Sequence, residues 1–215
     1  PSCLELTLAH RGFAWFRVDI TGVAAHGSQP ELGVDAIEQA RVVMMALEGL
    51  RGELEGRPRH PSLGYGTVRV ATIVGGVDAA TVAPSCTLTV ERRFLPGESP
   101  EAVEHELREV IDSAHSNGAS VTLTRLVARG AFEADPEWPI VRCVARNAES
   151  VLGRPAATRG EPFWTDAGLV LEAGIPCLIV GVDGGGAHAD TEWATVESIE
   201  QLTDILEATI REFCA

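Results

Sequence analysis

The sequence lacks long apolar runs and is poor in basic residues relative to acidic ones. No stretch reaches the roughly eighteen apolar residues that a membrane-spanning helix needs, so no such span is expected. The 215 residues include 17 lysines and arginines against 31 aspartates and glutamates, for a formal net charge of −14. Nucleic-acid backbones and anionic membranes bind through basic patches. We therefore predict that neither is the main partner of this protein.

Paired cysteine motifs and a visible signal-peptide pattern are also lacking in the given sequence. The cysteines are scattered and form no Cys-X-X-Cys pair, which argues against a zinc ribbon. Free thiols suit a reducing compartment, so we expect a cytoplasmic protein. The first residues, PSCLELTLAHRG, have neither the basic start nor the apolar core of a signal peptide. Because the chain begins with Pro1 rather than Met, we expect a part of a longer protein or a processed product.

Strand and helix patterns alternate in the first half of the chain. Alternating or β-branched runs predict strands over residues 14–21, 67–74, 86–94 and 119–127. Helical periodicity predicts helices over residues 33–50 and 99–117, and 51–66 is expected to be loop. The apolar stripe of the first helix would be Ile37, Ala40, Met44, Leu47 and Leu50. This β-α-β-β-α-β order predicts a ferredoxin-like domain over residues 13–127, with both helices on one face of an antiparallel sheet.

The second half has the pattern of an α/β domain. We expect a helix from Asp135–Pro136 to Leu152, a short strand over 156–159, and a helix from Thr165 or Asp166 to Gly174. A buried strand over 175–180 and a helix capped by Thr195 follow. The inward stripe of that last helix would be Val196, Ile199, Leu202, Ile205, Leu206, Ile210 and Phe213.

The predicted fold is therefore α+β. A ferredoxin-like domain at 13–127 interrupts a partial α/β domain made of residues 1–12 and 128–215. The helices of the second domain would lack part of the sheet that they should cover. Some of their apolar surface is therefore expected to be exposed.

A glycine-rich loop, GVDGGGAHADTEW, follows the apolar run at 175–180. Glycines let backbone come close to a ligand, and His188 lies in the loop with Asp190 and Glu192 behind it. A histidine with nearby carboxylates suits metal ligation or proton transfer. The alternative is an ordinary loop that contains a histidine.

The remaining histidines differ in context. His26 is at the centre of a loop of small residues, GVAAHGSQP. The others lie in terminal, loop or helix contexts and are predicted to be at the surface. These are His10, His60, His105 and His115.

Four motifs occur in order: GVAAHGSQPELGVDAI, ERRFLPGES, PFWTDAGLVLEAGIP and GGGAHADTEW. Together they resemble the M20 family of metal-dependent amidohydrolases and peptidases, in particular acetylornithine deacetylases and succinyl-diaminopimelate desuccinylases. The resemblance covers nearly the whole chain. It implies an α/β catalytic domain with two zinc ions and a ferredoxin-like lid that forms a homodimer. The implied activity is hydrolysis of the amide bond of an N-acyl amino acid or small peptide.

The resemblance also implies roles for residues of the lid. His26 corresponds to a histidine that reaches the partner subunit's active site and stabilises the oxyanion formed when water attacks the amide. Arg93 corresponds to a substrate-carboxylate binder, and Thr81 to a small polar substrate contact. The alternatives are a turn histidine without a task for His26, and an ion pair with Glu91 or Glu98 for Arg93.

For the metal site, the resemblance assigns His188 as a zinc ligand. Asp166 and Glu192 are candidates for the shell that supports this ligand. The alternatives are a helix N-cap for Asp166 and a solvated loop acid for Glu192.

The family's other metal ligands lie in a His-X-Asp motif, a bridging aspartate and a Glu-Glu pair, all before the lid. No His-X-Asp motif occurs before residue 13 of this sequence, and no Glu-Glu pair occurs anywhere in it. Since a zinc site needs at least three protein ligands, we predict that this chain alone is inactive. Two rival hypotheses remain: a non-catalytic dimerisation or ligand-binding module derived from such a hydrolase, and an amino-acid-sensing regulatory domain.

Overall fold

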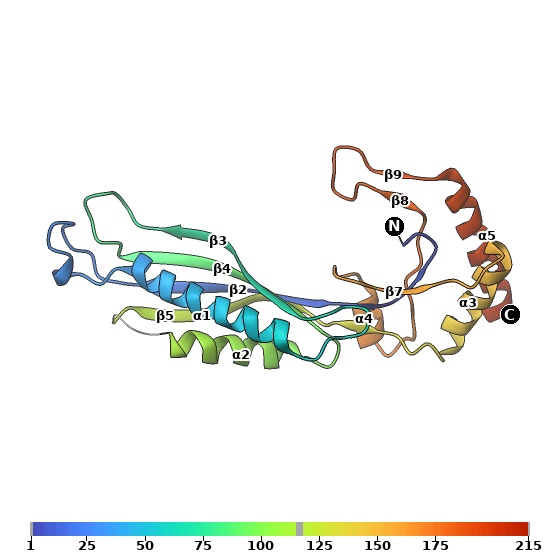
Figure 1. The fold of residues 1–215 in the computed structure, drawn as a ribbon, viewed down its shortest axis with the longest axis horizontal. Helices are drawn as coiled ribbons and strands as arrows, with labels where there is room; N and C mark the ends of the chain where they lie inside the picture. Colours follow the sequence, from blue (N-terminus) through green and yellow to red (C-terminus); the bar gives the residue numbers. More distant parts are fainter. Residues whose placement is uncertain (1, 115–117, 215) are drawn as a thin grey trace. The chain divides into compact units, whose positions relative to one another are not determined.

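The computed structural model describes residues 2–114 and 118–214 and divides into two compact units (Figure 1). One unit is Gly12–Gly130, and the other combines Pro1–Arg11 with Ala131–Ala215. His115 and Asn117, for which the sequence predicted a surface position and a helix end, lie outside the described residues.

The Gly12–Gly130 unit has the predicted ferredoxin-like order. Its elements are β2 (Gly12–Thr21), a 3-10 turn (Pro30–Leu32), α1 (Ala36–Gly56), β3 (Thr67–Gly75), β4 (Ser85–Phe94), α2 (Pro100–Ser113) and β5 (Ser120–Arg129). The strands form one four-stranded sheet in the order β3-β4-β2-β5, and all neighbours are antiparallel. β3 and β5 are therefore the edges of this sheet.

Both helices lie against the same face of the sheet (Figure 1). Alternate residues of β2 point into the core between them, and Phe16 and Val18 are fully buried. Val43 of α1 and Leu107 of α2 pack there as well. The opposite face of the sheet carries the intervening polar and aromatic side chains, such as Trp15, which is 44% exposed.

Helix α2 starts as the sequence predicted. The Ser99 side chain accepts a hydrogen bond from Ala102 N at 3.1 Å, and Pro100 occupies the first helical position. Helix α1 differs from the prediction at both ends. It begins directly after its N-cap residue, Asp35, whose carboxylate accepts from Ile37 N at 2.8 Å. It continues past Leu50 to Gly56.

The predicted stripe of α1 was partly wrong. Ile37 and Met44 are 44% and 38% exposed, whereas the helix buries Ala36, Gln39, Ala40, Val43, Leu47, Leu50 and Leu54. Leu54 belongs to the buried face and explains the longer helix, because a further turn of α1 gains contact with the core.

The other unit contains a smaller sheet and three helices. Its elements are β1 (Leu6–His10), β6 (Phe132–Glu133), α3 (Pro139–Leu152), β7 (Thr158–Glu161), α4 (Ala167–Glu172), β8 (Gly184–Gly185), β9 (Trp193–Ala194) and α5 (Val196–Phe213). The sheet has the order β6-β1-β7, with β1 and β7 parallel. Its core cluster is Leu6, Phe132, Ala134, Val141, Val144, Ala148 and Ile205.

Two predictions for this unit were wrong. Residues 175–180 do not form a buried strand: Ile175 is 56% exposed, and only Ile179 pairs, through reciprocal hydrogen bonds with Thr7 at 2.8 and 3.2 Å. Within the described residues, no strand forms a continuous ladder with residues 175–180, because the bridge to Thr7 is isolated. Helix α3 starts at Pro139 rather than at Asp135, whose carboxylate instead accepts from Glu137 N at 2.8 Å in the preceding turn.

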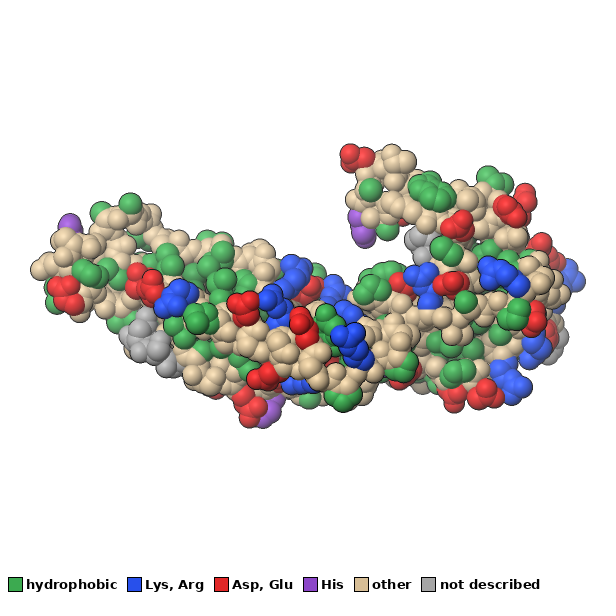
Figure 2. Space-filling model, in the orientation of Figure 1, with side chains coloured by type: hydrophobic (Ala, Val, Ile, Leu, Met, Phe, Trp, Pro, Cys, Tyr) green, Lys and Arg blue, Asp and Glu red, His purple; other side chains and the backbone are tan. Residues whose placement is uncertain are grey.

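Helix α5 leaves much of its apolar stripe uncovered. Ile205 is buried, but Val196, Ile199, Leu206, Ile210 and Phe213 are between 42% and 71% exposed. The inward stripe predicted for this helix is therefore wrong for these five positions, and the predicted exposure of apolar helix surface is confirmed. Figure 2 shows apolar side chains among charged ones on the surface of this unit. No helix among the described residues is long and apolar enough to cross a membrane.

Candidate functional site

His26, from the first motif, and Thr81, assigned by its position in the resemblance, lie together in the structure. They form an isolated antiparallel bridge between the loop after β2 and the loop before β4. Gly27 N donates to Ala80 O at 2.6 Å, and Val82 N donates to Ala25 O at 2.9 Å. A Cβ on Gly27 would lie only 2.8 Å from Ala80 O, so glycine permits this close approach of the two loops.

The imidazole of His26 is exposed, and one of its nitrogens has local partners. Nδ1 accepts a hydrogen bond from Ser28 N at 3.2 Å and lies 2.8 Å from Ser28 Oγ. An accepting Nδ1 places the proton of the neutral ring on Nε2. Because the residue is exposed, this Nε2–H can act as a hydrogen-bond donor to a ligand.

Arg93 lies on β4, and some of its side-chain donors already have a partner. Its Nε and Nη2 atoms lie 3.1 and 2.8 Å from Glu91 Oε1, and its guanidinium lies over the Phe13 ring at 5.3 Å from the centroid. The ion pair with Glu91 that the sequence left open is therefore present. Glu98, the other partner considered, pairs with Arg92 instead.

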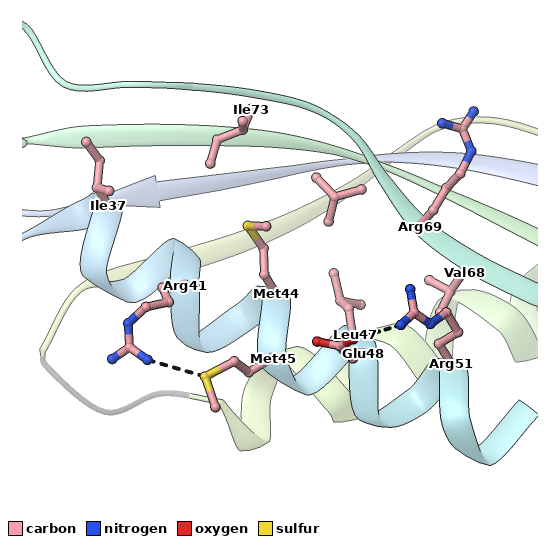
Figure 3. A pocket seen from close by; sticks show the side chains of 11 residues that line it. Ile37, Arg41, Met44, Met45, Leu47, Glu48, Arg51, Val68, Arg69 and Ile73 are labelled. Carbon is pink, nitrogen blue, oxygen red and sulfur yellow. Dashed lines mark hydrogen bonds and ion pairs between the residues drawn. The ribbon is translucent and has the colours of Figure 1, made fainter.

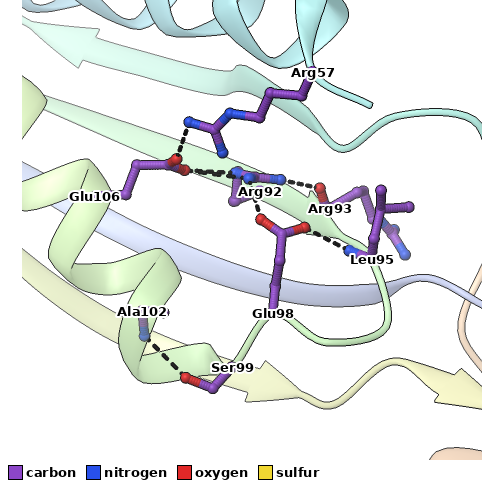
Figure 4. Close-up of polar contacts among 8 residues, drawn as sticks. All are labelled: Arg57, Arg92, Arg93, Leu95, Glu98, Ser99, Ala102 and Glu106. Carbon is purple, nitrogen blue, oxygen red and sulfur yellow. Dashed lines mark hydrogen bonds and ion pairs between the residues drawn. The ribbon is translucent and has the colours of Figure 1, made fainter. Parts of the chain in front are cut away.

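Arg92 is fully buried and holds the turn before α2 (Figure 4). Its Nη2 lies 2.9 Å from Glu98 Oε1 and 3.2 Å from Glu106 Oε2, and its Nη1 donates to the Arg93 carbonyl. Glu98 also accepts from Leu95 N at 2.7 Å. This network fixes the loop of the ERRFLPGES motif against the sheet, and its role is structural.

His188 lies at the tip of the β8–β9 hairpin. Its φ of +63° is in the left-handed region, which is uncommon for a residue other than glycine. Such strained backbone often occurs at functional sites. His188, Asp190 and Glu192 are all exposed, and His188 with Asp190 forms a His-X-Asp spacing inside this loop.

Asp166 occupies the N-cap position of α4 but makes no capping hydrogen bond. Thr165 Oγ1 instead accepts from Ala167 N at 3.2 Å. Asp166 is exposed, so its carboxylate is accessible.

A complete metal site is not formed by the part of the chain that the structure describes. Within residues 2–114 and 118–214, no three His, Cys, Asp or Glu side chains are grouped so that they could hold a metal ion. The described side chains therefore do not fit a two-zinc centre by themselves.

His10 is a feature that the sequence interpretation got wrong. It was predicted at the surface, but it is fully buried between Phe132 and Trp164, at centroid distances of 5.3 and 6.1 Å. Nδ1–H donates to Arg11 O at 3.0 Å, and Thr165 N donates to Nε2 at 3.4 Å. Burial lowers the pKa of His10 and favours the neutral ring. Its aromatic neighbours come from distant parts of the sequence, so no local signal indicated them.

A strained turn near the glycine-rich loop was also missed. Cys3 and Leu4 have φ values of +54° and +59°, and their N–H groups donate to Val182 O and Gly181 O at 3.2 and 2.9 Å. A hydrogen bond with Asp183 raises the pKa of the exposed Cys3 thiol, which disfavours the thiolate form. Cys3 and Leu4 are not glycines, so the sequence carries no local signal for their left-handed conformation.

Comparison with known proteins defines the class. A family model described as a peptidase dimerisation domain, M20_dimer, matches residues 8–119, more than half of the chain. The chain therefore belongs to the M20 peptidase family, and it combines the dimerisation domain with a C-terminal α/β portion.

Individual relatives align along the whole chain. Acetylornithine deacetylases of Vibrio atlanticus (strain LGP32) and Proteus mirabilis (strain HI4320) are each 28% identical over 219 residues; the matches cover all of this chain and 56% and 55% of those proteins. The solved structure of aminopeptidase PepT from Bacillus cereus matches with a TM-score of 0.81 at 22% identity, over 99% of this chain and 55% of that one. The chain thus spans about half the length of the curated relatives that it matches.

Proposed function

We propose that the chain is part of a zinc-dependent hydrolase that cleaves the amide bond of an N-acyl amino acid or small peptide. The observation that carries this proposal is the alignment with acetylornithine deacetylases over the full chain. The M20 dimerisation domain supports the same class. All five cysteines are free thiols, which fits the cytoplasmic location that we predict.

In this proposal, His26 and Thr81 act together. Their loops are joined by backbone hydrogen bonds, and the Nε2–H of His26 can donate to a developing oxyanion in the partner subunit's active site. Arg93 would bind the substrate carboxylate. His188 would supply one zinc ligand, supported by Asp166 and Glu192, and the remaining ligands would come from outside the described residues.

The proposed homodimer uses the β3 edge and α1. A groove of about 500 Å³ lies between these elements and is lined largely by apolar side chains, including Met44, Met45 and Ile73 (Figure 3). Met45 is 60% exposed, and Val74 on the edge strand is 73% exposed. An unpaired edge beside an apolar helix face suits a two-fold contact in which each copy presents the same surface.

Ile73→Glu is expected to weaken this dimer at least about 100-fold, because it places a charge at the centre of an apolar contact. The measurement is sedimentation equilibrium of the wild-type chain and the variant over a range of concentrations. Leu126→Glu is the matched control, since Leu126 is 50% exposed on the opposite edge strand, β5. A wild-type monomer throughout, or equal association of the wild type and Ile73→Glu, contradicts the proposed interface.

The hydrolase proposal is tested with the longest natural reading frame that contains this chain. We expect zinc-dependent release of acetate from N-acetyl amino acids, and a loss of about a thousandfold or more in kcat/KM for His188→Ala. His105→Ala is the control, because this side chain is 71% exposed on α2 and pairs with Glu109 on the same helix. The 215-residue chain alone is expected to show no turnover.

The rival function is a non-catalytic dimerisation or ligand-binding module. The observation in its favour is the M20 dimerisation domain, which this reading also accounts for. Zinc titration of the same reading frame by calorimetry separates the two. Two tight sites support the hydrolase, and the absence of tight sites supports the module.

A further inference from the structure

A charged and aromatic cluster occupies the sheet face opposite α1 and α2. Its centre is Glu91 on β4, which lies directly across from Trp15 on β2 and Arg69 on β3. Arg69 Nε lies 2.8 Å from Glu91 Oε2, and Arg93 Nη2 lies 2.8 Å from Glu91 Oε1. The indole N–H of Trp15 donates to Glu91 Oε1 at 3.2 Å. One buried carboxylate therefore orients two guanidinium groups and an aromatic ring.

The cluster carries an excess of positive charge. Burial alone would raise the pKa of Glu91, but the hydrogen bonds from Trp15 and Arg69 and the charge of Arg93 outweigh it and lower that pKa. The ionised carboxylate offsets only one of the two arginines. Arg129, across from Phe13 in the neighbouring row, adds another cation. This positive area stands out in a chain with a formal net charge of −14.

Both guanidinium groups keep donors for a ligand. Arg69 is bonded only through Nε, and Arg93 through Nε and Nη2. Among the described residues, the Nη atoms of Arg69 and Nη1 of Arg93 have no partner. The Arg69 side chain is 62% exposed and points away from α1 (Figure 3). Because Glu91 fixes both groups, they are preorganised to share an added carboxylate.

An apolar surface adjoins these donors. The rings of Phe13 and Trp15 are 5.3 Å apart, and the Arg93 guanidinium covers the Phe13 ring. Trp15 is 44% exposed, and its N–H is held by Glu91, so its orientation is set. Aromatic rings next to arginine suit a ligand that has an aromatic group close to its carboxylate.

We propose that this cluster binds an N-acyl aromatic amino acid, with the ligand carboxylate shared by Arg69 and Arg93 and the aromatic group packed on Trp15. Glu91 is a positioning residue that aligns both arginines. The proposal rests on the hydrolase function and names its substrate class. Arg69 and Trp15 become determinants of specificity beside the carboxylate binder Arg93.

The test measures binding by the 215-residue chain, without turnover. The indole N–H resonance of Trp15, assigned with Trp15→Phe, is followed during titration with N-acetyl-L-phenylalanine. We expect a saturable shift with a dissociation constant of about 0.1–1 mM. Arg69→Gln is expected to weaken binding about tenfold or more. Glu91→Gln should weaken it several-fold, because the arginines lose their alignment.

Arg17→Gln is the matched control. Arg17 lies on the same sheet face and pairs with Asp19 at 2.7 Å, outside the cluster, so binding should be unchanged. Two ligand variants test the contacts: the amide of N-acetylphenylalanine lacks the carboxylate and should not bind, and N-acetylglycine lacks the ring and should bind about tenfold more weakly.

Three results would overturn the proposal. They are no shift with the wild-type chain at about 20 mM ligand, equal affinity of Arg69→Gln and wild type, and equal affinity for the amide. Since the assay is binding alone, any of these leaves the hydrolase function to its own zinc-dependent assay. Conversely, binding without hydrolysis by the longer protein would overturn only the catalytic function.

Discussion

Replacing Arg92 by alanine is expected to lower the free energy of unfolding of the Gly12–Gly130 unit by about 3–5 kcal/mol. The guanidinium is fully buried, and it joins Glu98 and Glu106 to the carbonyl of Arg93 (Figure 4). Alanine would leave both carboxylates without this cation and would open a cavity beneath the turn before α2. Glu106 would keep only Arg57, whose Nη2 lies 2.6 Å from its Oε1.

Urea unfolding followed by circular dichroism measures this effect. Arg108→Ala is the matched control, because Arg108 is 46% exposed and pairs with Glu104 at 2.9 Å on the surface of α2. Exposed pairs of this kind contribute less than about 1 kcal/mol. If Arg92→Ala costs no more than Arg108→Ala, the buried network does not stabilise the unit.

Phe132→Ala is expected to destabilise the other unit by about 3–5 kcal/mol. Phe132 is fully buried and belongs to the core cluster with Leu6, Val141 and Ile205. Its ring also packs against His10 at a centroid distance of 5.3 Å. Alanine would remove contacts with β1 and α3 together, and this small sheet has few other large side chains with which to replace them.

Hydrogen exchange read residue by residue distinguishes the two units. In Phe132→Ala, protection should fall in β1, α3 and α5 and should persist in β2, β4 and α2, with the reverse pattern for Arg92→Ala. Phe163→Ala, at a residue that is 48% exposed in the same unit as Phe132, should change little. Uniform loss of protection across both units would show that they unfold together and would contradict this expectation.

Local patterns predicted the Gly12–Gly130 unit well. Alternating β-branched residues marked its strands, and Ser99 with Pro100 marked the start of α2. These signals act over a few residues, through capping and side-chain direction, and so they can be read from the chain. The end of α1 was missed because Leu54 gains its stability from packing, which periodicity alone did not indicate.

The other unit was less predictable. The run at 175–180 is apolar enough for a buried strand, but a strand needs neighbours, and only Thr7 bonds to Ile179. β1 and β6 were not expected, since each is short and pairs with residues far along the chain. The burial of His10 likewise depends on Phe132 and Trp164.

For the candidate site, the sequence indicated residue types and the structure decided their partners. His26 came from a motif and Thr81 from its position between motifs, and the bridge between their loops brings them together. Arg93 was identified from its motif, whereas Arg69 and Trp15 lie in none of the four motifs. The buried carboxylate of Glu91 contacts all three side chains and so joins residues of neighbouring strands.

Periodicity, caps and motif order along the chain were thus enough to predict the α+β class and membership of the M20 family. The fold class depends on neighbours within a turn or a strand, and the family membership depends on the order of short motifs. The tertiary structure alone decided which side chains lie together, which apolar faces of α1 and α5 stay uncovered, and which histidine is buried. Those outcomes depend on contacts between distant residues, whose free energy is gained only when the strands and helices assemble.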